Sequence, residues 1–205
     1  MAQQTKKLES IWTPANIVTC VRIVFMPVFM VLASLAHTGS GFVFDPMLSI
    51  MAFVVYLVLS LTDKVDGHLA RSRNEVTDFG KFLDPIADKL LVFSALLLLL
   101  DEGFVNVWFV FIILLREFLV SALRMVASAS GEVIAADKLG KAKTAVTMVS
   151  LCGYYLSFSA ASCGFMSACT WIFGISQALM IAAVVLTVVS GVQYFWNARS
   201  VVFRA

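Results

Sequence analysis

Residues 61–90 of this chain read LTDKVDGHLARSRNEVTDFGKFLDPIADKL, and the acidic part of this stretch runs from Asp63 to Asp88. Asp63 and Asp66 are three apart, and Asp84 and Asp88 are four apart. On helices, these spacings place both members of each pair on one face. One ionised side chain at the centre of a bilayer costs roughly 3 kcal/mol or more. Four converging carboxylates beside apolar segments therefore need counter-charges, which two divalent cations would supply.

The composition excludes an ordinary soluble domain. The chain has 205 residues, of which 60% are hydrophobic and 14% charged, and its mean hydropathy is +0.93. These values predict an all-α polytopic membrane protein that forms one domain over residues 1–205. The first ten residues are polar and the first apolar stretch lacks a small-residue cleavage site, so no cleaved signal peptide is expected. The four cysteines lack metal-ligand spacing and are expected to serve as small apolar helix residues.

We expect six membrane-spanning helices, preceded by a short interfacial helix or arm over residues 1–12. The apolar segments are residues 17–36, 47–61 (continued through Ala70), 78–100, 104–129, 140–161 and 171–196, followed by a basic tail from 197 to 205. Thr77 is a suitable N-cap for the third helix. Pro85 lies inside that helix, where a proline predicts a kink that aims Asp84 and Asp88 differently.

Lysine and arginine lie almost entirely on one side of this expected arrangement. The opposite loops, residues 37–46, 101–106 and 162–170, contain neither residue type. The positive-inside rule therefore predicts that both termini and the acidic stretch face the cytoplasm.

Written as a pattern, the stretch is Asp63-x2-Asp66-Gly67-x2-Ala70-Arg71-x8-Gly80-x3-Asp84-x3-Asp88. It resembles the signature of the CDP-alcohol phosphatidyltransferase family, with every fixed position filled. The resemblance implies that two divalent cations, Mg²⁺ or Mn²⁺, bind to Asp63, Asp66, Asp84 and Asp88. It also implies that Asp88 acts as the catalytic general base on the hydroxyl of an acceptor alcohol.

The residue chemistry is consistent with this resemblance, because carboxylate oxygens suit Mg²⁺ or Mn²⁺ and no Cys/His cluster suggests zinc. Small residues would let a nucleotide approach both helices, and Arg71 can offer a bidentate fork to a phosphate. The residues expected to bind CDP-diacylglycerol are Thr62, Asp63, Gly67, Ala70, Arg71, Thr77 and Gly80. The alternative is a solvated hairpin in which the acids pair with Lys64, Arg73, Lys81 and Lys89.

A second, basic set of residues follows the acidic stretch. The side chains expected to bind an acceptor phosphate are Arg116, Arg124, Lys141 and Lys143, together with Arg22 near the start of the first span. An intramembrane arginine is a functional-site candidate by default. Arg116 has an alternative role as a structural partner of Glu117, Arg22 could instead snorkel to the interface, and each lysine could be a membrane anchor.

Four further patterns limit the resemblance to one group of enzymes within this family. They are Arg116-Glu117-Phe118-x5-Arg124, Gly140-Lys141-x-Lys143-Thr144, Leu83-Asp84-Pro85-x-Ala87-Asp88-Lys89 and Asn16-x2-Thr19-x2-Arg22. They are similar to those of bacterial phosphatidylglycerophosphate synthases, apart from the local spacing in Pro14-Ala15-Asn16.

This narrower resemblance implies transfer of a phosphatidyl group from CDP-diacylglycerol to sn-glycerol 3-phosphate, with release of CMP. It implies a multi-pass homodimer in the bacterial inner membrane. The lipid bilayer is then a partner, and no nucleic acid is expected to bind. The alternatives are another acceptor (inositol phosphate, serine or phosphatidylglycerol) and, more distantly, a divalent-cation or proton-coupled transporter.

Overall fold

Six α-helices make up the described part of the computed structural model, which covers residues 13–39, 41–72, 78–129 and 138–202. Within these ranges, the side chains at 14–15, 63–72, 78, 81–82, 126, 128–129, 138, 198 and 200–202 lie outside the description. The helices are α1 (Pro14–Ala36), α2 (Pro46–Ser72), α3 (Asp78–Asp101), α4 (Val107–Ala129), α5 (Lys138–Ser162) and α6 (Met166–Val202). The described residues contain no strand beyond one isolated bridge between His37 and Phe44. The all-α prediction is therefore confirmed, whereas the expected arm over residues 1–12 and the Thr77 cap lie outside the described residues.

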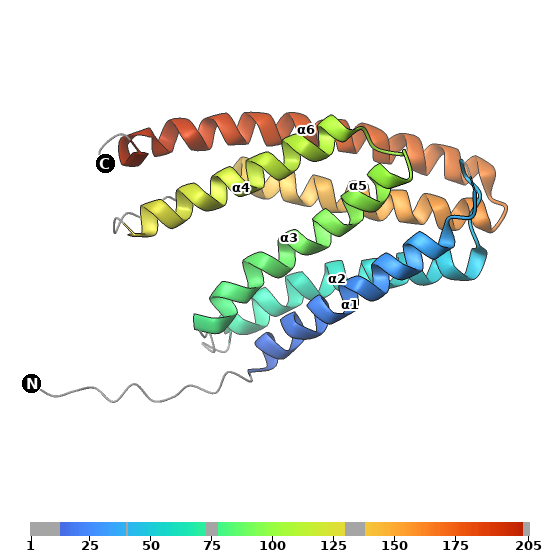
Figure 1. The fold of residues 1–205 in the computed structure, drawn as a ribbon, viewed down its shortest axis with the longest axis horizontal. Coiled ribbons are helices and arrows are strands. Elements are labelled where there is room, and N and C mark those ends of the chain that lie inside the picture. The colour runs from blue at the N-terminus through green and yellow to red at the C-terminus, as the bar shows by residue number, and fades with distance from the viewer. Residues whose placement is uncertain (1–12, 40, 73–77, 130–137, 203–205) are drawn as a thin grey trace, which may run out of the picture.

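Successive helices run in opposite directions (Figure 1). The first residues of α1, α3 and α5 and the last residues of α2, α4 and α6 therefore lie toward one end of the bundle. Helix α1 packs along α2 and against α3, and α6 packs along α5 and against α4. This arrangement brings the start of α3 and the second half of α4 to the same end as the start of α5.

The first two helices begin at side chains that cap them. Thr13 accepts a hydrogen bond from the Asn16 backbone N–H at 3.3 Å, and a proline follows it at the first helical position. Asp45 does the same for α2, accepting from the Leu48 N–H at 2.9 Å. These caps extend both helices by one to three residues beyond the apolar segments that predicted them.

The boundaries of α4 and α6 correct the prediction. Helix α4 begins at Val107 rather than at 104, because the Asn106 side chain accepts from the Trp108 N–H at 2.9 Å and fixes the first turn. Helix α6 runs from Met166 to Val202, so it includes part of the predicted loop and most of the predicted basic tail. A helix of 37 residues is about 55 Å long, which exceeds a hydrocarbon core of about 30 Å, so its ends extend beyond the apolar segment.

By length and composition, three helical segments among the described residues can cross a membrane: Asn16–Ala36, Leu139–Ser162 and Met166–Asn197. A shorter apolar segment, Pro46–Thr62, forms the first part of α2. Helices α3 and α4 are long enough but carry charged side chains within their apolar stretches. The fold is thus that of an all-helical membrane protein, and the charges that exclude α3 and α4 from the count belong to the site described below.

The bundle core contains a cluster of aromatic side chains. Phe29 of α1 contacts Tyr56 of α2 and Tyr155 of α5, with ring centroids 5.2 and 5.1 Å apart. Outward-facing apolar side chains remain exposed, including Val24 at 66% and Trp171 at 75%. A soluble protein rarely exposes such side chains in large continuous areas, so these faces are suited to lipid.

Candidate active site

Two acids of the predicted site, Asp84 and Asp88, are held by residues of α1. The Thr19 hydroxyl donates to Asp84 Oδ1 at 2.9 Å, and Arg22 Nη1 lies 3.3 Å from Asp88 Oδ1. Thr19 and Arg22 are three apart, so both project from one face of α1 toward α3. The packing of α1 on α3 therefore orients both carboxylates.

Arg22 is buried beside Asp88, which differs from one of the two roles considered for it. The side chain is 2% exposed and lies against Asp88, so it does not snorkel to a membrane surface. It also does not line the cavity that contains the other predicted phosphate-binding cations. The structure therefore associates Arg22 with the acidic half of the site.

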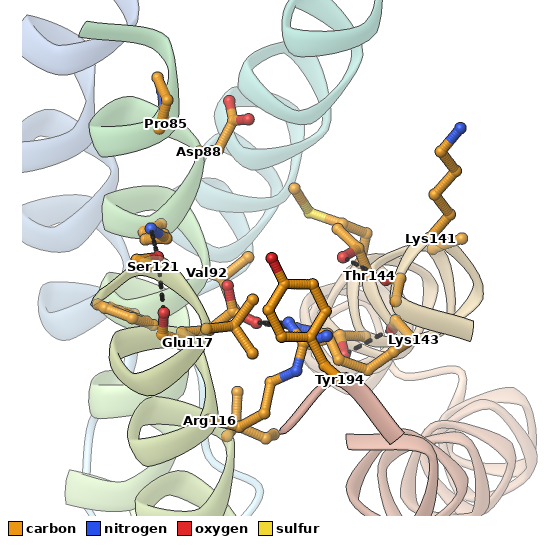
Figure 2. Close-up of a pocket in the computed structure, with 18 of the residues that line it drawn as sticks. Pro85, Asp88, Val92, Arg116, Glu117, Ser121, Lys141, Lys143, Thr144 and Tyr194 are labelled. Carbon is orange, nitrogen blue, oxygen red and sulfur yellow. Dashed lines mark hydrogen bonds and ion pairs between the residues drawn. The ribbon is translucent and has the colours of Figure 1, made fainter. Parts of the chain in front are cut away.

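A cavity of about 550 Å³ opens between α3, α4, α5 and α6. The predicted residues that line it are Asp84, Asp88, Arg116, Arg124, Lys141 and Lys143. Figure 2 shows Asp88 on the α3 side of the cavity and Lys143 across from it, with Lys141 pointing away from Arg116. The structure thus brings together acids and cations that are up to 59 positions apart in sequence, from Asp84 to Lys143.

Three charged side chains gather deep in this cavity (Figure 2). Glu117 Oε1 accepts from Arg116 Nη1 at 2.9 Å and also from Lys143 Nζ. All three side chains are largely buried, with exposed fractions of 13% for Arg116, 18% for Glu117 and 5% for Lys143. Removing such charges from water is costly unless each is paired. Glu117 stabilises two adjacent cations, which leaves one net positive charge in the cluster.

Arg116 does pair with Glu117, as its alternative interpretation predicted, and it also lines the cavity. Its Nε atom is buried, with no hydrogen-bond partner within the described part of the chain. Gly140 lies beside the guanidinium, since a Cβ added there would be 3.1 Å from Arg116 Nη2. The structural pairing and the phosphate-binding role are therefore compatible in geometry.

The second arginine of α4 contacts α6. Arg124 Nε donates to the Tyr194 hydroxyl at 3.2 Å, and its guanidinium carbon lies 5.6 Å from the centre of the Tyr194 ring. Tyr194 is 2% exposed and lines the cavity. The sequence patterns did not single out Tyr194, because an aromatic residue in an apolar helix carries no signal for a site.

Lys89 is a further cation that the predicted binding set omitted. Its Nζ donates to the Ser121 hydroxyl, and that hydroxyl donates to the Glu117 backbone carbonyl at 2.7 Å. Lys89 and Ser121 both line the cavity. The adjacency of Lys89 to Asp88 could have indicated it, although neighbouring residues on a helix point in different directions.

The α2 half of the predicted site is described only in its backbone. Residues 63–72 belong to the last turns of α2, but the side chains of Asp63, Asp66, Ala70 and Arg71 lie outside the description, as does Gly67 beyond its helical backbone. The Thr62 hydroxyl donates to the Leu59 carbonyl at 2.9 Å, and Gly80 is buried near the start of α3.

The described residues fit hard divalent cations in chemistry but provide only part of a ligand set. Asp84 and Asp88 present oxygen donors one helical turn apart, which is the donor type that Mg²⁺ and Mn²⁺ prefer. Among the described side chains, no three Asp, Glu, His or Cys residues cluster as a metal site. Completion of the site would therefore depend on Asp63 and Asp66.

Residues 12–189 match the family model of the CDP-alcohol phosphatidyltransferases. The chain belongs to this family. The matched region contains the whole cavity lining except Tyr194. Family membership makes the chain a membrane transferase of phospholipid biosynthesis, and enzymes of this family depend in general on divalent cations.

Similar proteins within the family bear names that agree with one another. The CDP-diacylglycerol–glycerol-3-phosphate 3-phosphatidyltransferase of Bacillus subtilis strain 168 is 37% identical over 193 residues, covering 89% of this chain and 95% of that protein. The enzyme of the same name from Rickettsia bellii is 31% identical, covering 88% and 92%. A probable phosphatidylglycerophosphate synthase of Mycobacterium tuberculosis strain H37Rv is 36% identical, covering 88% and 78%.

Proposed function

We propose that this phosphatidyltransferase moves the phosphatidyl group of CDP-diacylglycerol to sn-glycerol 3-phosphate, giving phosphatidylglycerophosphate and CMP. The observation that carries the proposal is the cavity in which Asp84 and Asp88 face a group of cations formed by Lys89, Arg116, Arg124, Lys141 and Lys143. The names of the similar proteins support the same reaction. Residues 1–205 would act as one domain.

The charge of the cavity favours a phosphorylated acceptor. Five cations and three acids line it, and Arg116 and Lys143 already share the single carboxylate of Glu117. An acceptor dianion would compensate the remaining charge, and the arginines can hold a phosphate through paired N–H groups. An acceptor without a phosphate, such as serine, would leave the excess positive charge of the cavity without a phosphate to compensate it.

The donor would lie over α2 and α3. Two divalent cations, Mg²⁺ or Mn²⁺, held by Asp63, Asp66, Asp84 and Asp88, would stabilise negative charge on the pyrophosphate. The proposed CDP-diacylglycerol contacts are Thr62, Asp63, Gly67, Ala70, Arg71, Thr77 and Gly80. The diacyl chains would remain in lipid, which accounts for a site at the membrane edge.

The chemistry assigned to this chain's own residues is a single in-line displacement. The primary hydroxyl of the acceptor attacks the phosphorus that carries the diacylglycerol, and the bond from this phosphorus to the bridging oxygen breaks to release CMP. Asp88 accepts the hydroxyl proton, a role that contributes typically 10²–10⁴-fold to a rate. Arg116, Arg124, Lys141 and Lys143 hold the acceptor phosphate, and Arg22 acts by orienting Asp88.

All six helices are proposed to span the bacterial inner membrane, with both termini and the cavity on the cytoplasmic side. The absence of Lys and Arg from residues 37–46, 101–106 and 162–170 supports this orientation. The alternating helix directions, which place the start of α1 and the end of α6 at one end, agree with it. A homodimer is proposed from the family resemblance.

The decisive test is an assay of purified protein with CDP-diacylglycerol and a panel of acceptors, scored by CMP release with and without divalent metal. Release only with glycerol 3-phosphate and metal is expected. Release with inositol phosphate or serine instead would replace the acceptor assignment. In the same assay, Asp88→Asn should lose at least about 100-fold in kcat; activity equal to that of the unmodified enzyme would refute the role of Asp88 as base.

A further inference from the structure

Two residues of α6, Gly191 and Tyr194, lie next to the arginines of α4, and Tyr194 also lines the cavity. They are three apart in sequence and therefore lie on one face of α6. That face packs against α4, since Gly191 contacts Arg116 and Tyr194 contacts Arg124. Gly191 also lies beyond residues 12–189, the part of the chain that the family model matches.

The missing side chain at Gly191 makes room for the aliphatic part of Arg116. A Cβ added at Gly191 would lie 3.2 Å from Arg116 Cγ, closer than the roughly 3.5–4.0 Å of an ordinary carbon–carbon contact. At the end of the side chain, the guanidinium lies beside Gly140, where an added Cβ would be 3.1 Å from Nη2. The Arg116 side chain is thus enclosed between α5 and α6, and its end is bound by Glu117 at 2.9 Å.

Tyr194 restricts Arg124 in two ways. Its hydroxyl accepts from Arg124 Nε at 3.2 Å, which directs that edge of the guanidinium toward α6. Its ring lies 5.6 Å from the guanidinium carbon, within cation–π range. Figure 2 shows the Tyr194 ring reaching into the cavity.

We propose that Gly191 and Tyr194 are positioning residues that set where Arg116 and Arg124 present their N–H groups, and so determine affinity for the acceptor phosphate. This inference rests on the proposed function. Binding of a phosphate by paired N–H groups depends on their direction. Fixing two flexible side chains before the ligand arrives lowers the entropy lost on binding. Helix α6 therefore acts in acceptor selection as well as in spanning the membrane.

The first test compares Gly191→Ala with Gly174→Ala, both on α6. A Cβ at Gly174 would meet no atom within 4 Å in the described structure, and both substitutions gain the same helix propensity. Gly191→Ala should displace Arg116 and raise the KM for glycerol 3-phosphate about tenfold, the size expected for weakening one charge-assisted contact. The KM for CDP-diacylglycerol and the melting temperature should match those of Gly174→Ala.

The second test compares Tyr194→Phe with Tyr154→Phe. Each variant loses one hydroxyl that makes one hydrogen bond to another residue. The Tyr154 hydroxyl donates to Gln177 Oε1 on α6, and Tyr154 does not line the cavity. Tyr194→Phe keeps the ring and should raise the KM for glycerol 3-phosphate about fivefold to tenfold. Tyr154→Phe should leave that KM unchanged.

The outcomes separate this inference from the proposed function. An unmodified enzyme that releases no CMP with glycerol 3-phosphate would overturn the proposed function. An active enzyme in which Gly191→Ala and Tyr194→Phe both stay within about twofold of their controls would overturn the positioning roles alone. If Gly191→Ala lowers the melting temperature relative to Gly174→Ala, the comparison of Tyr194→Phe with Tyr154→Phe decides whether α6 positions the arginines.

Discussion

Arg22 of α1 and Asp88 of α3 form an ion pair in which the arginine is buried and the aspartate is half exposed. The distance from Arg22 Nη1 to Asp88 Oδ1 is 3.3 Å, and the side chains are 2% and 48% exposed, respectively. Asp88 lines the cavity and Arg22 does not. Arg22 therefore lies behind the carboxylate and presents it to the cavity, which makes the α1–α3 contact part of the proposed catalytic arrangement.

Substitution of Arg22 tests this arrangement. Arg22→Lys keeps the charge but loses the planar fork, so Asp88 should move relative to the acceptor hydroxyl. A misplacement of about 1 Å can cost on the order of 100-fold, so kcat should fall by roughly that factor while the KM for glycerol 3-phosphate changes little. The measurement is steady-state kinetics with each substrate varied in turn, with the melting temperature as a check on folding.

Thr19→Val provides the matched control on the same face of α1, because it removes the hydrogen bond to Asp84 and keeps the side-chain shape. It should reduce kcat less than Arg22→Lys does. If Arg22→Lys instead raises the acceptor KM at unchanged kcat, Arg22 binds the acceptor phosphate, the role expected for it from the sequence.

Glu117 should be important for stability because it is the shared partner of two buried cations. Glu117→Gln removes the negative charge that compensates Arg116 and Lys143. Breaking a buried ion pair by removing one partner typically costs about 3–5 kcal/mol of stability. The double variant Glu117→Gln with Lys143→Met removes one of the stranded charges and should regain part of this loss. Thermal unfolding in detergent measures both.

Lys141→Met is the control for the loss of a positive charge from the same cavity, since Lys141 is exposed. Its melting temperature should stay close to that of the unmodified protein. If Glu117→Gln combined with Lys141→Met regains as much stability as Glu117→Gln combined with Lys143→Met, the total charge of the cavity, and not the shared pair, determines stability.

Glu102, in the turn between α3 and α4, should make stability depend on pH. Burial raises its pKa to about 7, and the charge of Asp101 acts in the same direction. The folded state therefore favours the protonated form. Stability should decrease as pH rises from about 4.5, the usual pKa of the group, to about 7. Glu102→Gln should raise the melting temperature at pH 8 and change it little at pH 5.

The control for Glu102 is Asp101→Asn, because Asp101 is exposed and contributes only the smaller of the two effects. It should raise the melting temperature at pH 8 by less than Glu102→Gln does. A Glu102→Gln variant whose melting temperature differs from that of the unmodified protein equally at pH 5 and pH 8 would exclude an ionisation effect.

Much of this site could be predicted from sequence because the relevant signals are local. The four-residue spacing of Asp84 and Asp88 placed both on one face of a helix, and charges inside apolar segments marked Arg116 and Lys143. The structure brings all four to one cavity. The same charges weaken the hydropathy of α3 and α4, so a functional site also makes these helices harder to count as spans.

The remaining features depend on contacts between helices, which periodicity does not encode. The pairing of Arg22 with Asp88 requires α1 to lie on α3 in one register, and no local pattern fixes that register. The role of Gly191 is visible only once Arg116 lies beside it. The cap at Asn106 could have been recognised from its side chain, but the apolar Phe104 before it suggested an earlier start for α4.

Lys89 connects the acidic and basic parts of the cavity, and its charge should contribute to acceptor binding. It follows Asp88 directly and donates to Ser121, whose hydroxyl donates to the Glu117 backbone carbonyl. A unit charge about 10 Å from an anion contributes on the order of 1–2 kcal/mol at an effective dielectric constant of about 20. Lys89→Met should therefore raise the KM for glycerol 3-phosphate roughly tenfold.

Ser121→Ala separates the charge of Lys89 from its hydrogen bond. This variant keeps the ammonium group in the cavity and removes only its partner, so the acceptor KM should rise less than in Lys89→Met. The effect of Lys89→Met should also diminish at high salt, since screening weakens the attraction that the charge provides. An acceptor KM that changes equally in both variants and is insensitive to salt would mean that Lys89 acts by holding α3 against α4, and not through its charge.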